Sequence, residues 1–273
     1  MDLHTIASIS RPNDEAELPK WTEGSSPLGG GTWLFSEPQP GLRHLIDLAG
    51  LRWDELTADE SGLRIGAMCR FGALAGLQAP SGWRAAALFG ACCDALVGSF
   101  KVQEVATVGG NVCLALPAGP IAALLVALDG ICVVRAADGG ERLLPAIDFI
   151  VGERRTVLGR GDLLRAMRLP ARALARRAAF RRLSLSAGGR SAALLIGTAG
   201  DRFALTVTAA TKRPVRLEFG AVPRAGALRA ALREAIPDEL LHDDVHGDPE
   251  WRRHGTEVLA EEIRLELGGT RCG

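Results

Sequence analysis

Residues 106–128 carry no charge, in a chain in which 23% of the residues are Asp, Glu, Lys or Arg. The length of this stretch would suit a membrane-spanning helix, which needs about 20 mostly apolar residues. A Gly-Gly-Asn sequence lies near its start, however, and Pro117 lies in its middle. A central proline destabilises a helix by about 3 kcal/mol. Only the run from Ile121 to Leu128 remains apolar and unbroken, so the pattern predicts a loop that leads into a buried helix.

Short apolar runs predict strands and helices in the rest of the first part of the chain. Apolar alternation on both sides of an Asp-Gly-Gly turn at 138–140 is typical of a β-hairpin. The predicted strands are 44–51, 63–68, 131–136 and 141–146, the closing segment is 162–170, and the predicted helices are 71–77 and 83–96.

The last hundred residues have a different pattern. Residues 179–188 and 202–220 alternate like antiparallel strands, whereas 190–200 suits either a short helix or a strand. Two amphipathic helices are predicted at 225–236 and 251–267. The arginine-rich segment 171–177 is interpreted as a linker, which gives two α+β domains with approximate boundaries 1–172 and 173–273.

Composition excludes several classes of protein. The 32 basic and 32 acidic residues balance, so there is no basic footprint for nucleic acid and no electrostatic membrane anchor. The six cysteines form no C-x-x-C pair, and we expect no zinc or iron–sulfur ligand set. The first twenty residues lack the apolar core of a secretory signal. We therefore expect a reducing, cytoplasmic setting.

Two glycine-rich segments are the main candidates for ligand binding: LGGGTWLF (28–35) and ATVGGN (106–111). Consecutive glycines allow the backbone to approach a ligand closely, and successive N–H groups can surround phosphate oxygens. Two tight turns are the alternative interpretation. The chain contains no P-loop and no dinucleotide fingerprint between a strand and a helix.

No catalytic or metal-binding set stands out. His242, His246 and His254 lie close in sequence to acidic residues, but Gly-Asp-Pro at 247–249 interrupts any helix that would align them. A surface loop is the favoured interpretation. No serine or cysteine has the partners of a nucleophile, so the chain is interpreted as a cofactor-binding protein without a catalytic residue or a metal site of its own.

The order of several motifs resembles the FAD-binding (medium) subunit of the molybdenum hydroxylases, the xanthine dehydrogenase and carbon monoxide dehydrogenase family. LGGGTWLF and HLIDLAGL are similar to the family's A-G-G-T-D-L loop and L-I-D-I strand. VGSFKVQEVATVGGNVCLALPAGP is similar to its signature T-I-G-G-N-x-C-N-A-S-P. The segment DGGERLLPAIDFIVGERRTVLGRGDLLRAMRLP follows the family's later pattern, and the last helix fits its C-terminal domain.

The resemblance implies an α+β fold. It has a two-subdomain α/β FAD-binding domain of the p-cresol methylhydroxylase type, followed by a C-terminal domain with a small antiparallel sheet packed on helices. FAD would lie between these parts, with the uncharged stretch forming a loop at the pyrophosphate and a core helix from Pro120. The residues carried over to FAD are Leu28, Gly29, Gly30, Gly31, Thr32, Trp33 and Leu34 in the first loop, Thr107, Val108, Gly109, Gly110 and Asn111 in the second, and Leu164 and Arg181.

Four positions depart from the family pattern. Trp33 stands in place of the Asp of G-G-T-D, the N-A-S-P stretch reads Leu114-Ala115-Leu116-Pro117, and Pro120 stands where an acidic residue is usual. Polar groups near the nucleotide are thus replaced by apolar ones.

The resemblance implies an electron-transfer flavoprotein subunit. It would take electrons from the clusters of an iron–sulfur subunit, next to a molybdenum cofactor-binding subunit, and pass them through FAD to NAD or oxygen. Two alternatives stay open. One is a stand-alone flavin oxidase of the vanillyl-alcohol oxidase superfamily. The other is a non-catalytic scaffold subunit with weakened FAD binding, which the departures at Trp33, Leu114, Leu116 and Pro120 suggest.

Overall fold

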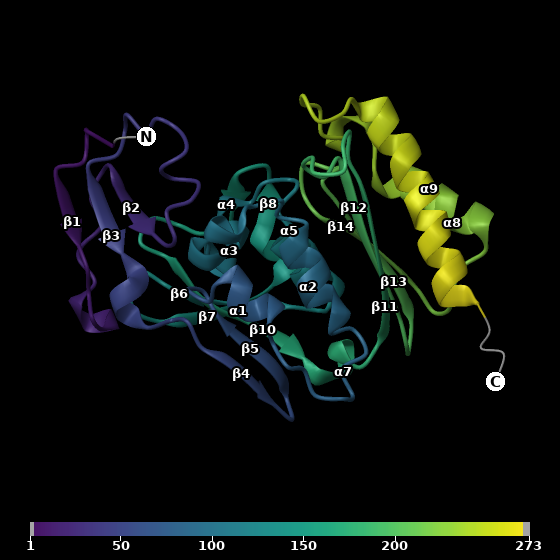
Figure 1. Ribbon diagram of the computed structural model, residues 1–273, viewed down its shortest axis with the longest axis horizontal. Helices are drawn as coiled ribbons and strands as arrows, with labels where there is room; N and C mark the ends of the chain where they lie inside the picture. The colour runs from purple at the N-terminus through teal and green to yellow at the C-terminus, as the bar shows by residue number, and fades with distance from the viewer. Residues whose placement is uncertain (1–2, 270–273) are drawn as a thin grey trace.

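The computed structural model describes residues 3–269 and has a mixed α+β fold, in agreement with the sequence (Figure 1). A small N-terminal sheet contains β1 (Ser8–Ser10), β2 (Ser25–Leu28) and β3 (His44–Asp47) in the order β1-β3-β2, and all its pairings are parallel. The predicted strand at 44–51 is shorter than expected because a 3-10 turn, Leu48–Leu51, follows β3 directly. Leu48 and Leu51 pack with Trp53 and Leu163 and so join this sheet to the next one.

The second sheet is antiparallel and has the order β4-β5-β10-β6-β7. The predicted hairpin around the Asp-Gly-Gly turn is confirmed as β6 and β7. The strands are β4 (Leu56–Asp59), β5 (Gly62–Gly66), β6 (Ile131–Arg135), β7 (Glu141–Pro145) and β10 (Leu163–Pro170), with a two-stranded accessory, β8 (Ile150–Gly152) and β9 (Arg155–Thr156).

Short helices lie beside this sheet, and α5 is at their centre (Figure 1). The helix begins at Pro120, as expected, and all eight of its residues are buried. The helices of this part are α1 (Phe71–Ala75), α2 (Ala87–Asp94), α3 (Phe100–Val105), α4 (Val108–Leu114), α5 (Pro120–Ala127) and α6 (Ala146–Phe149).

The C-terminal part is a four-stranded antiparallel sheet in chain order. Its elements are β11 (Arg177–Leu183), β12 (Ala193–Ala199), β13 (Phe203–Thr208), β14 (Val215–Phe219), α8 (Ala225–Ala235) and α9 (Pro249–Gly268). Helix α9 covers one face of the sheet, and α5 of the preceding part covers the other (Figure 1). The sheet is therefore the layer that joins the two halves of the chain.

Strand β12 shows why the segment 190–200 was ambiguous. Leu194 and Ile196 belong to the core that contains α5, whereas Leu195 belongs to the core under α9. A strand buried on both faces loses the polar positions that would show a period of two. The sequence therefore reads as a continuous apolar run, and only the sheet identifies it as a strand.

Two other expectations are corrected. Segment 171–177 is not a linker, because it forms α7 (Ala171–Leu174) and the first residue of β11, with Ala173 and Leu174 buried. The Thr107–Asn111 segment is not a loop. Thr107 caps a helix that starts at Val108, and the oxygen of its side chain accepts a hydrogen bond from the Gly110 N–H at 3.1 Å.

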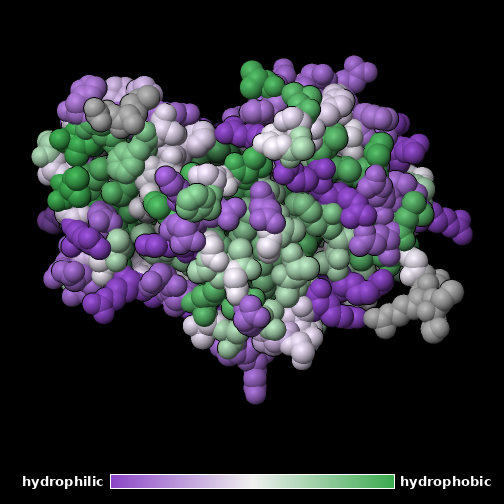
Figure 2. All heavy atoms as spheres, in the orientation of Figure 1, coloured by the Kyte–Doolittle hydropathy of each residue, from purple (hydrophilic) through white to green (hydrophobic). Residues whose placement is uncertain are grey.

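The described helices can be compared with the requirements of a membrane-spanning segment. Among residues 3–269, no helix is both long enough and apolar enough to cross a membrane. Figure 2 shows hydrophilic and hydrophobic side chains interspersed on the visible face, with an indentation where the N-terminal lobe meets the rest of the chain.

Candidate cofactor-binding site

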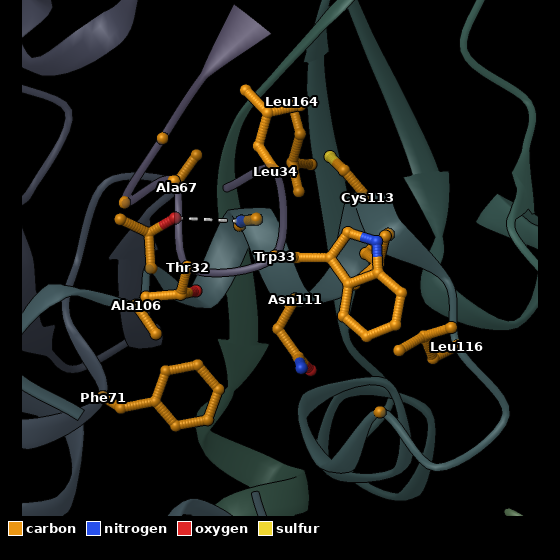
Figure 3. A pocket seen from close by; sticks show the side chains of 18 of the residues that line it. Thr32, Trp33, Leu34, Ala67, Phe71, Ala106, Asn111, Cys113, Leu116 and Leu164 are labelled. Atoms are coloured by element: carbon orange, nitrogen blue, oxygen red, sulfur yellow. Dashed lines mark hydrogen bonds between the residues drawn. The ribbon is translucent and has the colours of Figure 1, made fainter. Parts of the chain in front are cut away.

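A cavity of about 470 Å³ lies where the three parts of the chain meet. The loop after β2 forms one wall, and the start of α4 with the loop after it forms another. The start of β10 closes a third side, and Arg190, from the loop between β11 and β12, reaches the cavity from the C-terminal sheet. Figure 3 shows side chains from these separate segments turned toward one space.

The first glycine loop packs so closely that its glycines are required. A β-carbon on Gly30 would lie 1.9 Å from the carbonyl oxygen of Val105. Gly31 has φ +69°, a conformation that favours glycine, and a β-carbon there would meet the Phe35 ring at 2.4 Å. The loop then turns, because the Gly31 carbonyl accepts from the Phe35 N–H at 2.9 Å.

The residues of this turn line the cavity. Among the described residues, the N–H groups from Gly30 to Leu34 donate no hydrogen bond to another backbone carbonyl or side chain. Successive free N–H groups in a tight turn form a concave site for anionic oxygens. The first loop therefore has the features that the sequence predicted for a phosphate-binding backbone.

The second glycine segment contributes differently from the prediction. The Val108 N–H donates to the Cys69 carbonyl at 2.8 Å, and the Gly109 N–H donates to the Ala67 carbonyl at 2.9 Å. Val108 is fully buried in the core and does not line the cavity. The segment thus offers side chains and glycine surfaces rather than free N–H groups, because the N–H groups of Val108 and Gly109 already attach α4 to the segment that follows β5.

Thr107, Gly109, Gly110 and Asn111 do line the cavity. The Asn111 Oδ1 accepts from the Ile121 N–H at 3.3 Å, which fixes the start of α5 against α4. The Nδ2 group of Asn111 has no partner among the described residues, so it remains available to a ligand. In Figure 3 Asn111 lies between Phe71 and Trp33, below the first loop.

The remaining wall is apolar. Leu164 of β10, which the resemblance assigned to the cofactor, lines the cavity together with Leu114, Leu116 and Cys113. Burial raises the pKa of the Cys113 thiol to about 12, which keeps it protonated at neutral pH. This wall can hold a large apolar group and exclude water from it, but it supplies no nucleophile.

Trp33 occupies a central position in the cavity wall. The guanidinium carbon of Arg154 lies 5.8 Å from its ring centroid and that of Arg190 lies 6.0 Å from it, both within range of cation–π attraction. The indole nitrogen is buried and has no hydrogen-bond partner among residues 3–269. A buried, unpaired donor is unfavourable, so a ligand acceptor at this point would stabilise the site.

The cavity wall carries two charged residues, Asp162 and Arg190, neither of which the sequence predicted. Asp162 accepts from the Ala137 N–H at 3.0 Å and from the Gly159 N–H at 2.9 Å, and it pairs with Arg142. No sequence signal marked Arg190, because it lies in a strand-connecting loop whose position depends on the C-terminal sheet.

Arg181, which the resemblance assigned to the cofactor, lies elsewhere. Its guanidinium binds Glu262 at 2.9 Å and Glu266 at 2.7 Å on α9, and it does not line the cavity. These carboxylates raise the pKa of Arg181. Arg181 lies on β11, none of whose residues lines the cavity, and its side chain points to α9.

The acidic loop before α9 is also more structured than predicted. His242 is buried, and its Nε2 lies 3.2 Å from an Asp244 carboxylate oxygen. Asp244 also pairs with the buried Arg252 of α9. Among the described residues, no group of three or more His, Cys, Asp and Glu is placed to hold a metal ion. Asp244 therefore anchors α9 through Arg252, and His242 contacts the same carboxylate.

Comparison with known proteins identifies the family. Residues 7–172 match the family described as the FAD binding domain in molybdopterin dehydrogenase. The comparison with curated protein sequences finds no significant match.

Solved structures show the same fold over almost the whole chain. The chain is similar to a chain of carbon monoxide dehydrogenase from Hydrogenophaga pseudoflava, in a form that lacks the Mo-pyranopterin moiety of the molybdenum cofactor. The identity is 21%, the coverage is 98% of this chain and 99% of the other, and the TM-score is 0.81. Reconstituted CO dehydrogenase from Oligotropha carboxidovorans gives 22% identity, 98% coverage of both chains and a TM-score of 0.79. Quinoline 2-oxidoreductase from Pseudomonas putida 86 gives 18% identity, 98% coverage of both chains and a TM-score of 0.78.

The cavity combines unpaired backbone N–H groups with an apolar wall, which suits a cofactor with an anionic linker and a large ring system. The family match covers the parts that form most of this cavity. The chain therefore belongs to the FAD-binding domain family of the molybdopterin dehydrogenases, oxidoreductases of the molybdenum hydroxylase class, and its cofactor is FAD.

Proposed function

We propose that the chain is the electron-transfer flavoprotein subunit of a cytoplasmic molybdenum hydroxylase, and that its FAD occupies the 470 Å³ cavity. In this assignment an iron–sulfur subunit delivers electrons that originate at a molybdenum cofactor-binding subunit. The flavin passes them to NAD or to oxygen. The family description, which places this FAD domain in molybdopterin dehydrogenases, supports the assignment to a larger assembly.

The observation that carries the proposal is the free backbone of the first glycine loop beside the apolar wall. The N–H groups from Gly30 to Leu34 would bind the diphosphate, and Thr107 and Asn111 would add side-chain donors. Leu164, Leu114 and Leu116 would enclose the flavin and exclude bulk water from it. When bound, FAD supplies the electron-transfer chemistry, and the protein supplies binding, orientation and electrostatics.

The first test is a visible absorption spectrum of the purified chain, before and after acid precipitation. We expect flavin bands in the native protein, or after incubation with FAD, that are released to the supernatant by acid. The cavity-lining residues include no histidine, so the structure offers no imidazole there for a covalent flavin link. A flavin that stayed with the precipitate would favour the stand-alone oxidase instead.

The scaffold alternative keeps one supporting observation, because Trp33, Leu114, Leu116 and Pro120 all line the cavity where the family pattern has polar residues. A protein that remains colourless after incubation with excess FAD would contradict the electron-transfer proposal and support a non-catalytic subunit.

A further inference from the structure

The charges of the cavity wall are unbalanced. Asp162 and Arg190 are its charged residues among those described, and the charge of Asp162 is compensated by Arg142. Arg190 forms no ion pair and no side-chain hydrogen bond with another described residue, and its guanidinium lies over the Trp33 ring. The wall therefore presents one uncompensated positive charge, from a loop of the C-terminal sheet.

The backbone around Arg190 is held in place on both sides. The Ala192 N–H donates to the Leu183 carbonyl at 2.7 Å, which closes the hairpin of β11 and β12. The Gly189 N–H donates to the Ser186 carbonyl at 2.9 Å, and the Arg182 guanidinium donates to the Gly189 carbonyl. The guanidinium of Arg190 thus starts from a fixed point at the cavity rim rather than from a free loop.

Trp33 also restricts the position of the Arg190 side chain. The Arg190 and Arg154 guanidinium groups both lie over the indole ring, so the ring limits where the Arg190 guanidinium can lie. Arg154 is also near Glu37, at 3.9 Å, whereas Arg190 has no described carboxylate partner. Of the two cations on the indole, Arg190 is the one that lines the cavity and keeps its charge uncompensated.

We propose that Arg190 is the cation that balances the negative charge of bound FAD, and that Trp33 positions its guanidinium. The inference rests on the FAD-binding role proposed above. Two sources supply this negative charge: the diphosphate, which is anionic in every redox state, and the flavin ring, which gains electron density on reduction. A positive charge near the ring stabilises the reduced form and raises its potential.

The test compares FAD binding and flavin potential in four single variants. Arg190→Gln removes the charge, and Arg190→Lys keeps it. Arg181→Gln removes the arginine that the sequence resemblance assigned to FAD. Arg213→Gln is the matched control, since Arg213 is exposed, lies in the same sheet region and forms no ion pair with a described residue. Because Arg190 is also exposed, its variants should fold, which circular dichroism verifies.

For oxidised FAD, tryptophan-fluorescence titration of the apo-protein should show an affinity about 10-fold lower for Arg190→Gln than for wild type, the loss of one charge-assisted contact. Arg190→Lys should recover most of this loss. The difference in FAD affinity between wild type and Arg190→Gln should become smaller at high ionic strength, because salt screens the interaction between the guanidinium and the anion. This result identifies the diphosphate as the source of negative charge.

If oxidised affinity is unchanged, the midpoint potential of the bound flavin is decisive. A potential lower in Arg190→Gln than in Arg213→Gln identifies the reduced ring as the source. A tenfold loss of affinity for the reduced form corresponds to about 30 mV for a two-electron couple. The inference is overturned if Arg190→Gln matches Arg213→Gln in both measurements, or if Arg190→Lys is as impaired as Arg190→Gln.

A variant of the indole tests the positioning role separately. Trp33→Leu should weaken FAD binding less than Arg190→Gln, and in the double variant the two effects should fall short of additive. Additive effects would contradict the claim that Trp33 acts through Arg190. If wild type itself binds no FAD, the proposed function fails; if wild type binds FAD and the Arg190 variants do not differ from the control, only this inference fails.

Discussion

At the scale of single residues, the shape of the candidate site depends on glycines, whose lack of a β-carbon allows close packing. Gly30 lets the first loop lie against the Val105 carbonyl, and Gly31 adopts the left-handed conformation that turns the chain. Together they leave the following N–H groups free. A side chain is also excluded at Gly109, where a β-carbon would lie 2.5 Å from the Ala67 carbonyl oxygen. Close backbone contact, rather than a polar side chain, shapes this part of the cavity.

Gly30→Ala tests this packing. The added methyl group would overlap the Val105 carbonyl, so the loop must move away from α3. We expect a loss of about 1–3 kcal/mol in unfolding free energy, typical of overpacking, and weaker FAD binding. Gly41→Ala is the control, because a β-carbon there meets nothing within 4 Å. Equal unfolding curves for the two variants in urea would contradict the packing argument.

At the scale of secondary-structure elements, α9 is attached to its sheet by a buried cation. Arg252, only 1% exposed, donates to the carbonyl of Ala192 at 2.7 Å and to that of Ala209 at 2.6 Å, and it pairs with Asp244. It therefore binds the start of β12, the end of β13 and the acidic loop at one point. Ala192 follows Arg190 closely, so this anchor also fixes one end of the loop that reaches the cavity.

Arg252→Ala should lower the unfolding free energy by about 3 kcal/mol, because it leaves the Ala192 and Ala209 carbonyls without this donor and the Asp244 carboxylate without its cationic partner. Arg253→Ala is the neighbouring control, since Arg253 pairs with Asp238, a carboxylate that is 92% exposed. Its loss should stay below about 1 kcal/mol. Chemical denaturation of both variants gives the comparison, and similar losses would refute the anchoring role of Arg252.

At the scale of the whole molecule, the two halves meet around Asp129, just after α5. Arg176 lies 2.9 Å from its carboxylate and Arg216 lies 2.5 Å from it, and Arg216 also donates to the Val126 carbonyl near the end of α5. Burial opposes ionisation of this carboxyl group, but the guanidinium groups of Arg216 and Arg176 hold its pKa below the ordinary value of 3.8. The ion cluster therefore joins the FAD-binding part to the C-terminal sheet while Asp129 is ionised.

This pKa shift predicts a pH dependence with a definite sign. Since the folded-state pKa of Asp129 is depressed, its stabilising contribution is present above pH 3.8 and is lost as the pH falls through the folded-state value. Asp129→Asn should be less stable than wild type near neutral pH, and the difference should shrink in acid. Asp54→Asn is the control, because Asp54 is exposed and forms no ion pair with a described residue. A stability difference that stays constant from neutral pH to below pH 3.8 would rule out this linkage.

The sequence by itself determined the local features. The Asp-Gly-Gly turn gives the hairpin of β6 and β7, Pro120 begins α5, and the amphipathic patterns give α8 and α9. The turn at Gly31 was predictable for the same reason, because its positive φ favours glycine within the loop. These signals act over a few residues, so a single sequence is sufficient to read them.

The tertiary structure decided the features that depend on distant contacts. Strand β12 is buried on both faces, so its sequence lacks the alternation of polar and apolar residues that marks a strand. The segment predicted as a loop forms α4, whose first residues, Val108 and Gly109, donate hydrogen bonds to the segment after β5. The pleat of β11 placed Arg181 on α9, whereas the hairpin brought Arg190 to the cavity. Which side chain reaches a site is set by the register and face of a whole sheet, and this information lies in the packing of the elements rather than in the residues beside the site.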